Sequence, residues 1–242
     1  MARGVRLGKF RLAVLGDAML DVYLFGEAER VSPEAPVLVL RARGEERRPV
    51  SPELAERLLA GLEAWEPDAV VVEDYDKGVL TPYLIERLRA LKVPLFVDPK
   101  FKNFRLYKRV RLLKPNRAEL AAQADGLAPP EAAAKLYREL APGVLVVTLG
   151  GEGMLVVAGG RLWRVPALRR EVYDVTGAGD TVIAYLTVAL LSGLNPLEAA
   201  AVAALAGGVK VGKFGAAAVA PEELPWEELS KLLEGSKCLG PT

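Results

Sequence analysis

Histidine is absent from the 242 residues of this chain, and cysteine occurs once. Without an imidazole, the chain lacks the side chain that most often moves protons near neutral pH, and it lacks the usual nitrogen ligand of zinc. The single cysteine, Cys238, cannot form a disulfide within the chain. Any bound metal must therefore have oxygen ligands, which suits Mg²⁺ held together with phosphates.

An excess of one charge is also missing, because 32 basic residues face 31 acidic ones and the formal net charge is +1. This balance argues against a nucleic acid or an anionic membrane as partner. No apolar run has membrane-spanning length and no N-terminal signal pattern is present, so we expect a cytoplasmic protein. The pattern Gly-x-x-x-x-Gly-Lys-Ser/Thr does not occur either, which excludes a P-loop kinase.

The residues that are present favour a single α/β domain over residues 1–242, because 51% hydrophobic composition at this length can bury a large core. Strand-like and helix-like segments alternate from residue 69, which predicts a doubly wound, mostly parallel sheet with helices on both faces. Two apolar segments around Gly159-Gly160 predict a hairpin. The expected strands are 12–15, 69–72, 95–97, 110–113, 144–147, 154–158 and 161–165; the expected helices are 53–64, 82–91, 131–141, 182–191, 197–211 and 222–234, followed by a flexible tail over 235–242.

The stretch Asp174-Val-Thr-Gly-Ala-Gly-Asp-Thr181 stands directly before the apolar segment 182–191. Its glycines are expected at a helix N-terminus, where unpaired backbone N–H groups and the helix dipole bind anions. Asp180 would lie in the first turn, where a carboxylate can take the proton of an attacking hydroxyl during phosphoryl transfer. The alternative is a tight turn in which the aspartate only caps the helix.

Polar residues end several of the predicted strands, at the sheet edge where such folds bind ligands. Asp17 and Asp21 follow the first strand and could accept hydrogen bonds from sugar hydroxyls, or merely cap a turn. Asn116 and Glu119 are three apart on an incipient helix and share one face, where the carboxylate could hold a metal-bound water. The alternative for Glu119 is a solvated helix residue.

The 171–183 stretch, Glu171-Val-Tyr-Asp-Val-Thr-Gly-Ala-Gly-Asp-Thr-Val-Ile183, resembles the signature of the ribokinase-like (PfkB) carbohydrate kinases. It is most similar to the branch formed by the D-glycero-D-manno-heptose 7-phosphate kinase domain of the bifunctional ADP-heptose synthesis protein. Further motifs resemble the same branch: Gly16-Asp-Ala-Met-Leu-Asp21, Ser32-Pro-Glu-Ala-Pro36, Asp74-Tyr-Asp-Lys-Gly78, Asp98-Pro-Lys100 and Asn116-Arg-Ala-Glu119.

The resemblance implies an ATP- and Mg²⁺-dependent kinase acting on a small sugar phosphate, with Asp180 as the base. The backbone of Gly177, Ala178 and Gly179 would form the anion hole, Asn116 and Glu119 would place the metal, and Asp17 and Asp21 would face the sugar. Lys77 and Lys100 could hold the 7-phosphate. The implied nucleotide contacts are Thr148, Gly150, Gly153, Thr176, Val209, Gly212 and Gly215. Segment 22–43 would be a partial β lid, which in several members of the family forms a homodimer.

One departure from the family follows Pro49, where Val50-Ser-Pro stands in place of the expected Gly-Gly-x-x-x-Asn sugar-binding motif. An internal deletion or an omitted segment would explain this, and it would remove part of the sugar site and reduce the lid. Three functions therefore remain: a heptose 7-phosphate kinase, a PfkB kinase for another sugar or nucleoside, and a catalytically impaired nucleotide-binding remnant.

Overall fold

The computed structural model describes residues 5–17, 49–215 and 217–242. Its strands form one sheet in which the spatial order follows the chain order, with the first five strands parallel and the last three added in antiparallel fashion. The strands are β1 (Leu12–Gly16), β2 (Ala69–Glu73), β3 (Leu95–Asp98), β4 (Leu112–Leu113), β5 (Val144–Thr148), β6 (Met154–Ala158), β7 (Arg161–Val165) and β8 (Lys237–Pro241). The first seven were predicted, although β4 is two residues shorter than expected.

The helices begin where the sequence provides capping residues. The side chains of Ser51, Thr81, Asn116 and Asn195 each accept a hydrogen bond from a backbone N–H group in the first turn of the helix that follows. The helices are α1 (Pro52–Trp65), α2 (Pro82–Ala90), α3 (Arg117–Ala122), α4 (Pro129–Leu140), α5 (Ala178–Leu191), α6 (Pro196–Lys210) and α7 (Leu229–Gly235), with short 3₁₀ turns η1 (Phe104–Leu106), η2 (Gly150–Glu152), η3 (Pro221–Glu223) and η4 (Trp226–Glu228).

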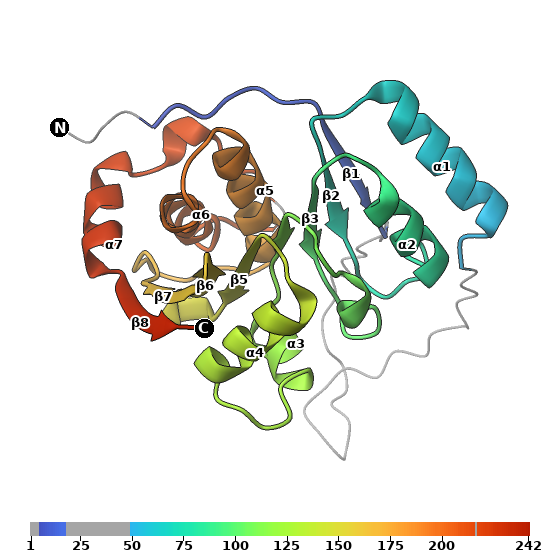
Figure 1. The fold of residues 1–242 in the computed structure, drawn as a ribbon. Coiled ribbons are helices and arrows are strands. Elements are labelled where there is room, and N and C mark those ends of the chain that lie inside the picture. Colours follow the sequence, from blue (N-terminus) through green and yellow to red (C-terminus); the bar gives the residue numbers. More distant parts are fainter. Residues whose placement is uncertain (1–4, 18–48, 216) are drawn as a thin grey trace, which may run out of the picture.

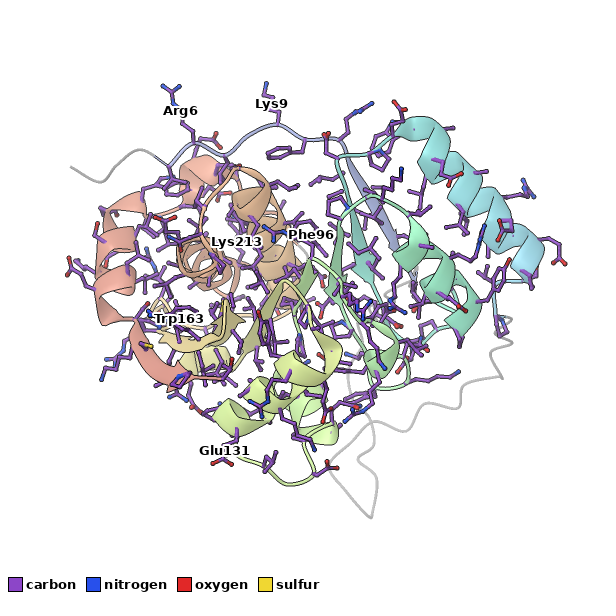
Figure 2. All side chains as sticks on the ribbon, in the orientation of Figure 1. Arg6, Lys9, Phe96, Glu131, Trp163 and Lys213 are labelled. Atoms are coloured by element: carbon purple, nitrogen blue, oxygen red, sulfur yellow. The ribbon has the colours of Figure 1, made fainter. Side chains whose placement is uncertain are left out.

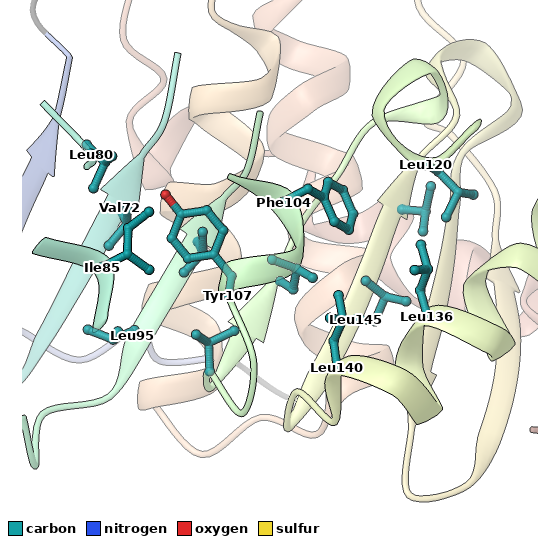
Figure 3. Packing of buried hydrophobic residues seen from close by; sticks show 14 of the residues in the cluster. Val72, Leu80, Ile85, Leu95, Phe104, Tyr107, Leu120, Leu136, Leu140 and Leu145 are labelled. Carbon is teal, nitrogen blue, oxygen red and sulfur yellow. The ribbon is translucent and has the colours of Figure 1, made fainter. Parts of the chain in front are cut away.

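Alternate strand residues face two separate cores, one on each side of the sheet. In β2, Val70 and Val72 pack in the core under α1, α2 and α4, whereas Ala69 and Val71 pack in the core under α5, α6 and α7. Figure 1 shows these two groups of helices on opposite sides of the strands, and Figure 3 shows part of the first core, with Tyr107 at its centre. The predicted α/β fold with helices on both faces is confirmed.

The two helical layers have different origins in the chain. The helices that connect the parallel strands, from α1 to α4, all cover the first face, and the second face is covered by α5, α6 and α7, which follow the hairpin β6–β7. The strand order does not reverse within the described strands. The N-terminus of α5 therefore reaches the sheet from the face opposite to the connecting helices.

The C-terminal region differs from the prediction in two ways. The expected flexible tail over 235–242 is wrong, because β8 pairs with β7 and extends the sheet. Its sequence, Lys-Cys-Leu-Gly-Pro, has little strand propensity, and backbone pairing with an open edge strand supplies what the side chains do not. The expected continuous helix over 222–234 is also wrong, because Pro225 cannot continue a helix and separates η3 from η4 and α7.

Among the described residues, no helix is both long and apolar enough to cross a membrane. Charged side chains such as Arg6, Lys9 and Glu131 point away from the ribbon in Figure 2, while Phe96 of β3 is fully buried between the sheet and the helices. The predicted lid over 22–43 and Asp21 lie outside the described residues.

Gly153, between η2 and β6, offers a direct test of this fold. Its φ is +88°, and an added Cβ would lie 2.0 Å from the carbonyl oxygen of Val165. We expect Gly153→Ala to lower the free energy of unfolding by about 2 kcal/mol or more, because both the backbone and its neighbour must move. Urea unfolding followed by tryptophan fluorescence measures the change.

The matched control is Gly151→Ala, two residues away, where an added Cβ would meet nothing within 4 Å. This variant should stay within about 0.5 kcal/mol of the parent. Equal effects of the two substitutions would contradict the close approach of Gly153 to β7.

Candidate active site

The carboxyl ends of the parallel strands gather polar side chains in one row, as predicted. The ladder places Gly16 opposite Glu73 and Glu73 opposite Asp98, and an isolated bridge joins Asn116 to Thr148. A cleft of about 660 Å³ lies over this edge, between the row and the first turn of α5.

The first turn of α5 closes the other side of the cleft. Gly177 is the N-cap, with a left-handed backbone (φ 71°) and no side-chain cap. Within the described part of the chain, the N–H groups of Gly177, Gly179 and Asp180 have no hydrogen-bond acceptor, whereas that of Ala178 donates to the carbonyl of Val175 at 3.1 Å. The structure thus revises the expected anion-hole donors: Ala178 is already paired, and Asp180 offers a backbone donor in its place.

Asp180 is exposed to the cleft and is held by one side chain. The Tyr75 hydroxyl donates to its Oδ1 at 2.8 Å. Its other oxygen, Oδ2, lies 3.9 Å from the position that a Cβ on Gly177 would take, so it is next to the turn that carries the unpaired N–H groups. The carboxylate and the anion donors are therefore side by side, which phosphoryl transfer to a hydroxyl requires.

Three carboxylates converge beside this turn. Glu73, Asp98 and Asp180 each offer an oxygen within 4.8 Å of the others. Lys114, whose side chain is 2% exposed, forms an ion pair with Asp98 at 2.7 Å. One buried lysine does not neutralise three acids, so the group carries excess negative charge when all three are ionised.

The electrostatic cost of this crowding raises two pKa values. Burial, and then the charges of Asp98 and Asp180, raise the pKa of Glu73 to about 8. Burial also raises the pKa of Asp98 to about 6, although Lys114 opposes the shift. The Oε2 atom of Glu73 is buried without a hydrogen-bond partner among the described residues. An unpartnered carboxylate oxygen in an acidic group fits a divalent cation with oxygen ligands.

Asn116 and Glu119, the predicted metal residues, form a capping box at the start of α3. Glu119 is buried, and its two oxygens accept from the Asn116 N–H at 2.8 Å and from Lys100 Nζ at 2.9 Å. Both residues line the cleft. Their direct role is to fix the cleft wall, and any contact of Glu119 with a metal through water stays a prediction.

Asp17 holds the loop that follows β2 instead of standing free. Its carboxylate accepts from the N–H groups of Tyr75, Lys77 and Val79 at 2.9, 3.0 and 2.9 Å. These three bonds place Tyr75, and through it the carboxylate of Asp180. A direct contact of Asp17 with a sugar stays a prediction, as does that of Asp21.

Asp74 anchors the loop that follows β2 to buried residues of the core. The hydroxyl of Tyr107 and the amide of Asn103 donate to its Oδ2 at 2.6 and 3.0 Å, and all three residues are buried. Burial and the negative charge of Asp74 raise the pKa of Tyr107, so its hydroxyl stays a donor. Sequence reasoning missed Asn103 and Tyr107, because no spacing links them to Asp74.

The two lysines predicted to hold a phosphate differ in their surroundings. Lys100 lines the cleft, forms an ion pair with Glu119, and lies 5.6 Å from the ring centroid of Tyr75. Lys77 has an exposed side chain and does not line this cleft. The structure therefore brings Lys100, and not Lys77, to the described part of the site.

An apolar slot of about 450 Å³ adjoins the cleft and shares Thr148, Gly150, Val175 and Gly179 with it. Of the predicted nucleotide contacts, Thr148, Gly150 and Gly153 line the slot. Thr176, Val209, Gly212 and Gly215 do not. The slot is lined instead by residues from the 167–175 segment, α5 and α6, among them Leu168, Val172, Val175, Val182, Ala204, Gly207, Gly208 and Val211.

Sequence reasoning missed Gly207 and Gly208 as slot residues. Two adjacent glycines in an alanine-rich helix were the available signal, because they allow another segment to approach the helix closely. An added Cβ on Gly208 would lie 2.7 Å from the Cβ of Leu168, so the 167–170 segment can only approach α6 at a glycine. A narrow apolar slot with few side chains suits a flat aromatic base.

Comparison with known proteins matches residues 66–223 to the pfkB family carbohydrate kinases. Bifunctional protein HldE of Geotalea uraniireducens is 34% identical over 310 residues, which cover 90% of this chain and 63% of that protein. Bifunctional protein HldE of Halorhodospira halophila is 36% identical over 297 residues, covering 88% and 62%. This chain thus spans less than two thirds of the length of these relatives.

The aligned stretches are longer than the 242 residues of the chain, so the relatives carry internal residues that this chain lacks. This agrees with an internal gap, whose expected position after Pro49 stays a prediction.

Solved structures show the same fold. Phosphofructokinase-2 from Escherichia coli in complex with potassium superposes with a TM-score of 0.63 at 18% identity, covering 77% of this chain and 63% of that chain. Ribokinase from Thermotoga maritima gives a TM-score of 0.55 at 26% identity, covering 70% and 57%. The fold is ribokinase-like, and the chain belongs to the pfkB family of carbohydrate kinases.

Proposed function

We propose that this chain transfers the γ-phosphoryl group of ATP to a hydroxyl of a sugar phosphate, and that the sugar is D-glycero-D-manno-heptose 7-phosphate. The observation that carries the proposal is that the carboxylate of Asp180 lies beside backbone N–H groups that have no acceptor among the described residues, at the N-terminus of α5. The choice of sugar rests on the similarity to the HldE proteins and on the motifs at 74–78 and 98–100.

In the proposed reaction the adenine occupies the apolar slot and the phosphates extend into the cleft. Asp180 accepts the proton of the sugar hydroxyl as its oxygen bonds to the γ-phosphorus, and the bond from that phosphorus to the bridging oxygen of ADP breaks. The N–H groups of Gly177 and Gly179 receive the charge that accumulates on the transferred group.

Tyr75 has a supporting part in this reaction. Its hydroxyl occupies Oδ1 of Asp180, which leaves Oδ2 for the sugar hydroxyl. Burial and the hydrogen bond to Asp180 raise the pKa of Tyr75, so the tyrosine remains a donor through the neutral range.

Mg²⁺ fits this chemistry, and the carboxylates of Glu73 and Asp98 are the residues we expect to hold it, directly or through water, with Glu119 behind them. When bound, the ion would neutralise charge on the β- and γ-phosphates. Deprotonated Glu73 and Asp98 are the forms that would bind it.

A specific observation favours a second candidate, a nucleotide-binding remnant with impaired catalysis. The relatives carry internal residues that this chain lacks, and the sugar motif expected after Pro49 is absent. The experiment that separates the candidates is ADP release from Mg-ATP with and without the heptose phosphate, beside a panel of other sugars. A cytoplasmic location and a dimer through segment 22–43 remain predictions of the same proposal.

We expect heptose-dependent ADP release in that assay, because the groups for transfer are retained. ADP release with a different sugar would support the phosphoryl transfer and would assign the chain another sugar substrate. ATP binding without release for any sugar would favour the remnant.

Substituting Asp180→Asn should lower kcat about 10²–10⁴-fold, because the amide cannot accept the hydroxyl proton. The affinity for ATP, measured by calorimetry, should stay within a few-fold. Asp125→Asn is the control, since Asp125 is exposed and pairs with Lys135 far from the cleft. If turnover and ATP affinity fall together, the role assigned to Asp180 is wrong.

The acidic group predicts a pH-dependent effect of Mg²⁺ on stability. The pKa of Glu73, about 8, lies above its ordinary value, so the folded state binds more protons than the unfolded state between about pH 4.5 and 8. Stability without metal should therefore fall as pH rises through this window, and Asp98, with its pKa of about 6, contributes in the same direction.

Mg²⁺ should restore stability more at pH 8 than at pH 6, because it competes with protons for the carboxylates. Thermal unfolding at both pH values, with and without Mg²⁺, measures the effect. Glu73→Gln should reduce both the pH dependence and the Mg²⁺ response, whereas Glu131→Gln on the surface should change neither. A Mg²⁺ response that survives Glu73→Gln unchanged would place the ion elsewhere.

A further inference from the structure

Lys210 is a buried cation that the proposed reaction leaves without a role. It is the last residue of α6 and is 1% exposed, which is rare for lysine because an ammonium group loses its hydration on burial. Its Nζ donates to the carbonyl of Gly215 at 2.6 Å, and no carboxylate of the described residues forms a salt bridge with it. Because burial of this ammonium group is costly, we expect its role to involve the residues around it.

The end of this side chain lies directly behind the anion site. The Cε atom of Lys210 is 3.4 Å from the position that a Cβ on Gly177 would occupy, and Oδ2 of Asp180 is 3.9 Å from the same position. Gly177, whose φ of 71° favours glycine, thus has the lysine on one side and the catalytic carboxylate beside it. The ammonium group stands next to the turn that carries the unpaired N–H donors.

Two loops are joined at this point. Asp174 accepts from the N–H of Thr176 at 2.9 Å, and its other oxygen accepts from the N–H of Gly215 at 2.8 Å. Lys210 binds the carbonyl of the same Gly215. Gly215 is therefore held through its N–H by the signature loop and through its C=O by α6.

The charges at this junction support each other. Hydrogen bonds from the backbone and side chain of Thr176, then that from the Gly215 backbone, and the nearby charge of Lys210 hold the pKa of Asp174 below its ordinary value. The carboxylate and the ammonium thus hold the 174–177 loop against the 211–215 turn, and neither side chain lines the cleft.

We propose that Lys210 is a positioning residue whose ammonium serves as a tethered cation behind the anion hole. It fixes the Gly177 turn through Gly215 and Asp174, and it adds positive charge where the transferred phosphoryl group becomes most negative. A charge that is itself fixed and buried acts strongly and needs no reorganisation during the reaction. This inference rests on the proposed function, because it assumes that a phosphoryl group occupies the turn.

The first test is Lys210→Met, which keeps the length and apolar stem and removes the charge. We expect kcat to fall about tenfold or more, by analogy with the loss of one donor at an oxyanion site, with a smaller rise in KM for ATP. Lys135→Met is the control, because Lys135 is a partly buried lysine that pairs with Asp125 and lines neither the cleft nor the slot. It should leave kcat within about twofold.

A second variant separates charge from packing. Lys210→Ala removes three methylenes and the ammonium, and added n-propylammonium should restore part of kcat, whereas 1-propanol of equal size should not. Equal rescue by the alcohol would show that Lys210 only fills space, and unchanged kcat in Lys210→Met would overturn the proposal outright.

A binding measurement tests the role of Lys210 separately from the proposed kinase activity. Wild type should bind a non-hydrolysable ATP analogue more tightly than ADP, and Lys210→Met should reduce this preference while leaving adenosine affinity unchanged. If wild type releases no ADP with any sugar but shows the preference and its loss, the kinase proposal fails and the role of Lys210 stands. If the variant shows the same preference as wild type, the proposed role of Lys210 is wrong and the kinase proposal is unaffected.

Discussion

The ion pair between Lys114 and Asp98 is the constraint on which the site depends. Lys114 is almost fully buried, and the carboxylate of Asp98, at 2.7 Å, compensates its ammonium group for the lost hydration. Gly179 passes directly over this pair: an added Cβ would lie 3.5 Å from Nζ of Lys114 and 3.7 Å from Oδ2 of Asp98. The first turn of α5 therefore lies against this ion pair at the sheet edge, and Gly179 and Asp180 line the cleft beside it.

Charge is arranged in two layers around the transfer point. On the sheet side, Glu73, Asp98 and Asp180 converge, and among the described residues Lys114 pairs with Asp98, so negative charge remains in excess. On the helix side, the unpaired N–H groups of α5 and the buried Lys210 present positive charge. A nucleotide phosphate chain with its metal ion would neutralise both layers at once. The metal ion would balance the acids, and the phosphates would bind the positive N–H groups and lie near Lys210.

The sequence predicted most of the fold, because the signals were local. Strand runs bounded by polar residues, capping residues and the Gly159-Gly160 turn are read over a few neighbours, and these elements lie where expected. The strand β8 was missed because it exists through backbone pairing to β7 and not through its own side chains. For the site, motifs placed Asp180 and the strand-end residues, but not the partners of Asp74, the slot glycines or the burial of Lys210. Those depend on which helix faces which loop, and a single sequence does not contain that information.

The described residues on either side of segment 18–48 are attached to the same loop of the domain. Asp17, at the end of β1, holds the loop 74–79 through three backbone N–H groups, and the N–H of Val50, just before α1, donates to the carbonyl of Gly78 in the same loop. Asp17 and Val50 are therefore both anchored to the 74–79 loop. Because both attachment points are fixed by that loop, the core under α1 closes through Ala55 and Leu59 whatever length of chain lies between them. The contacts that place Tyr75 beside Asp180 lie wholly within the described residues, so they do not depend on the length of segment 18–48.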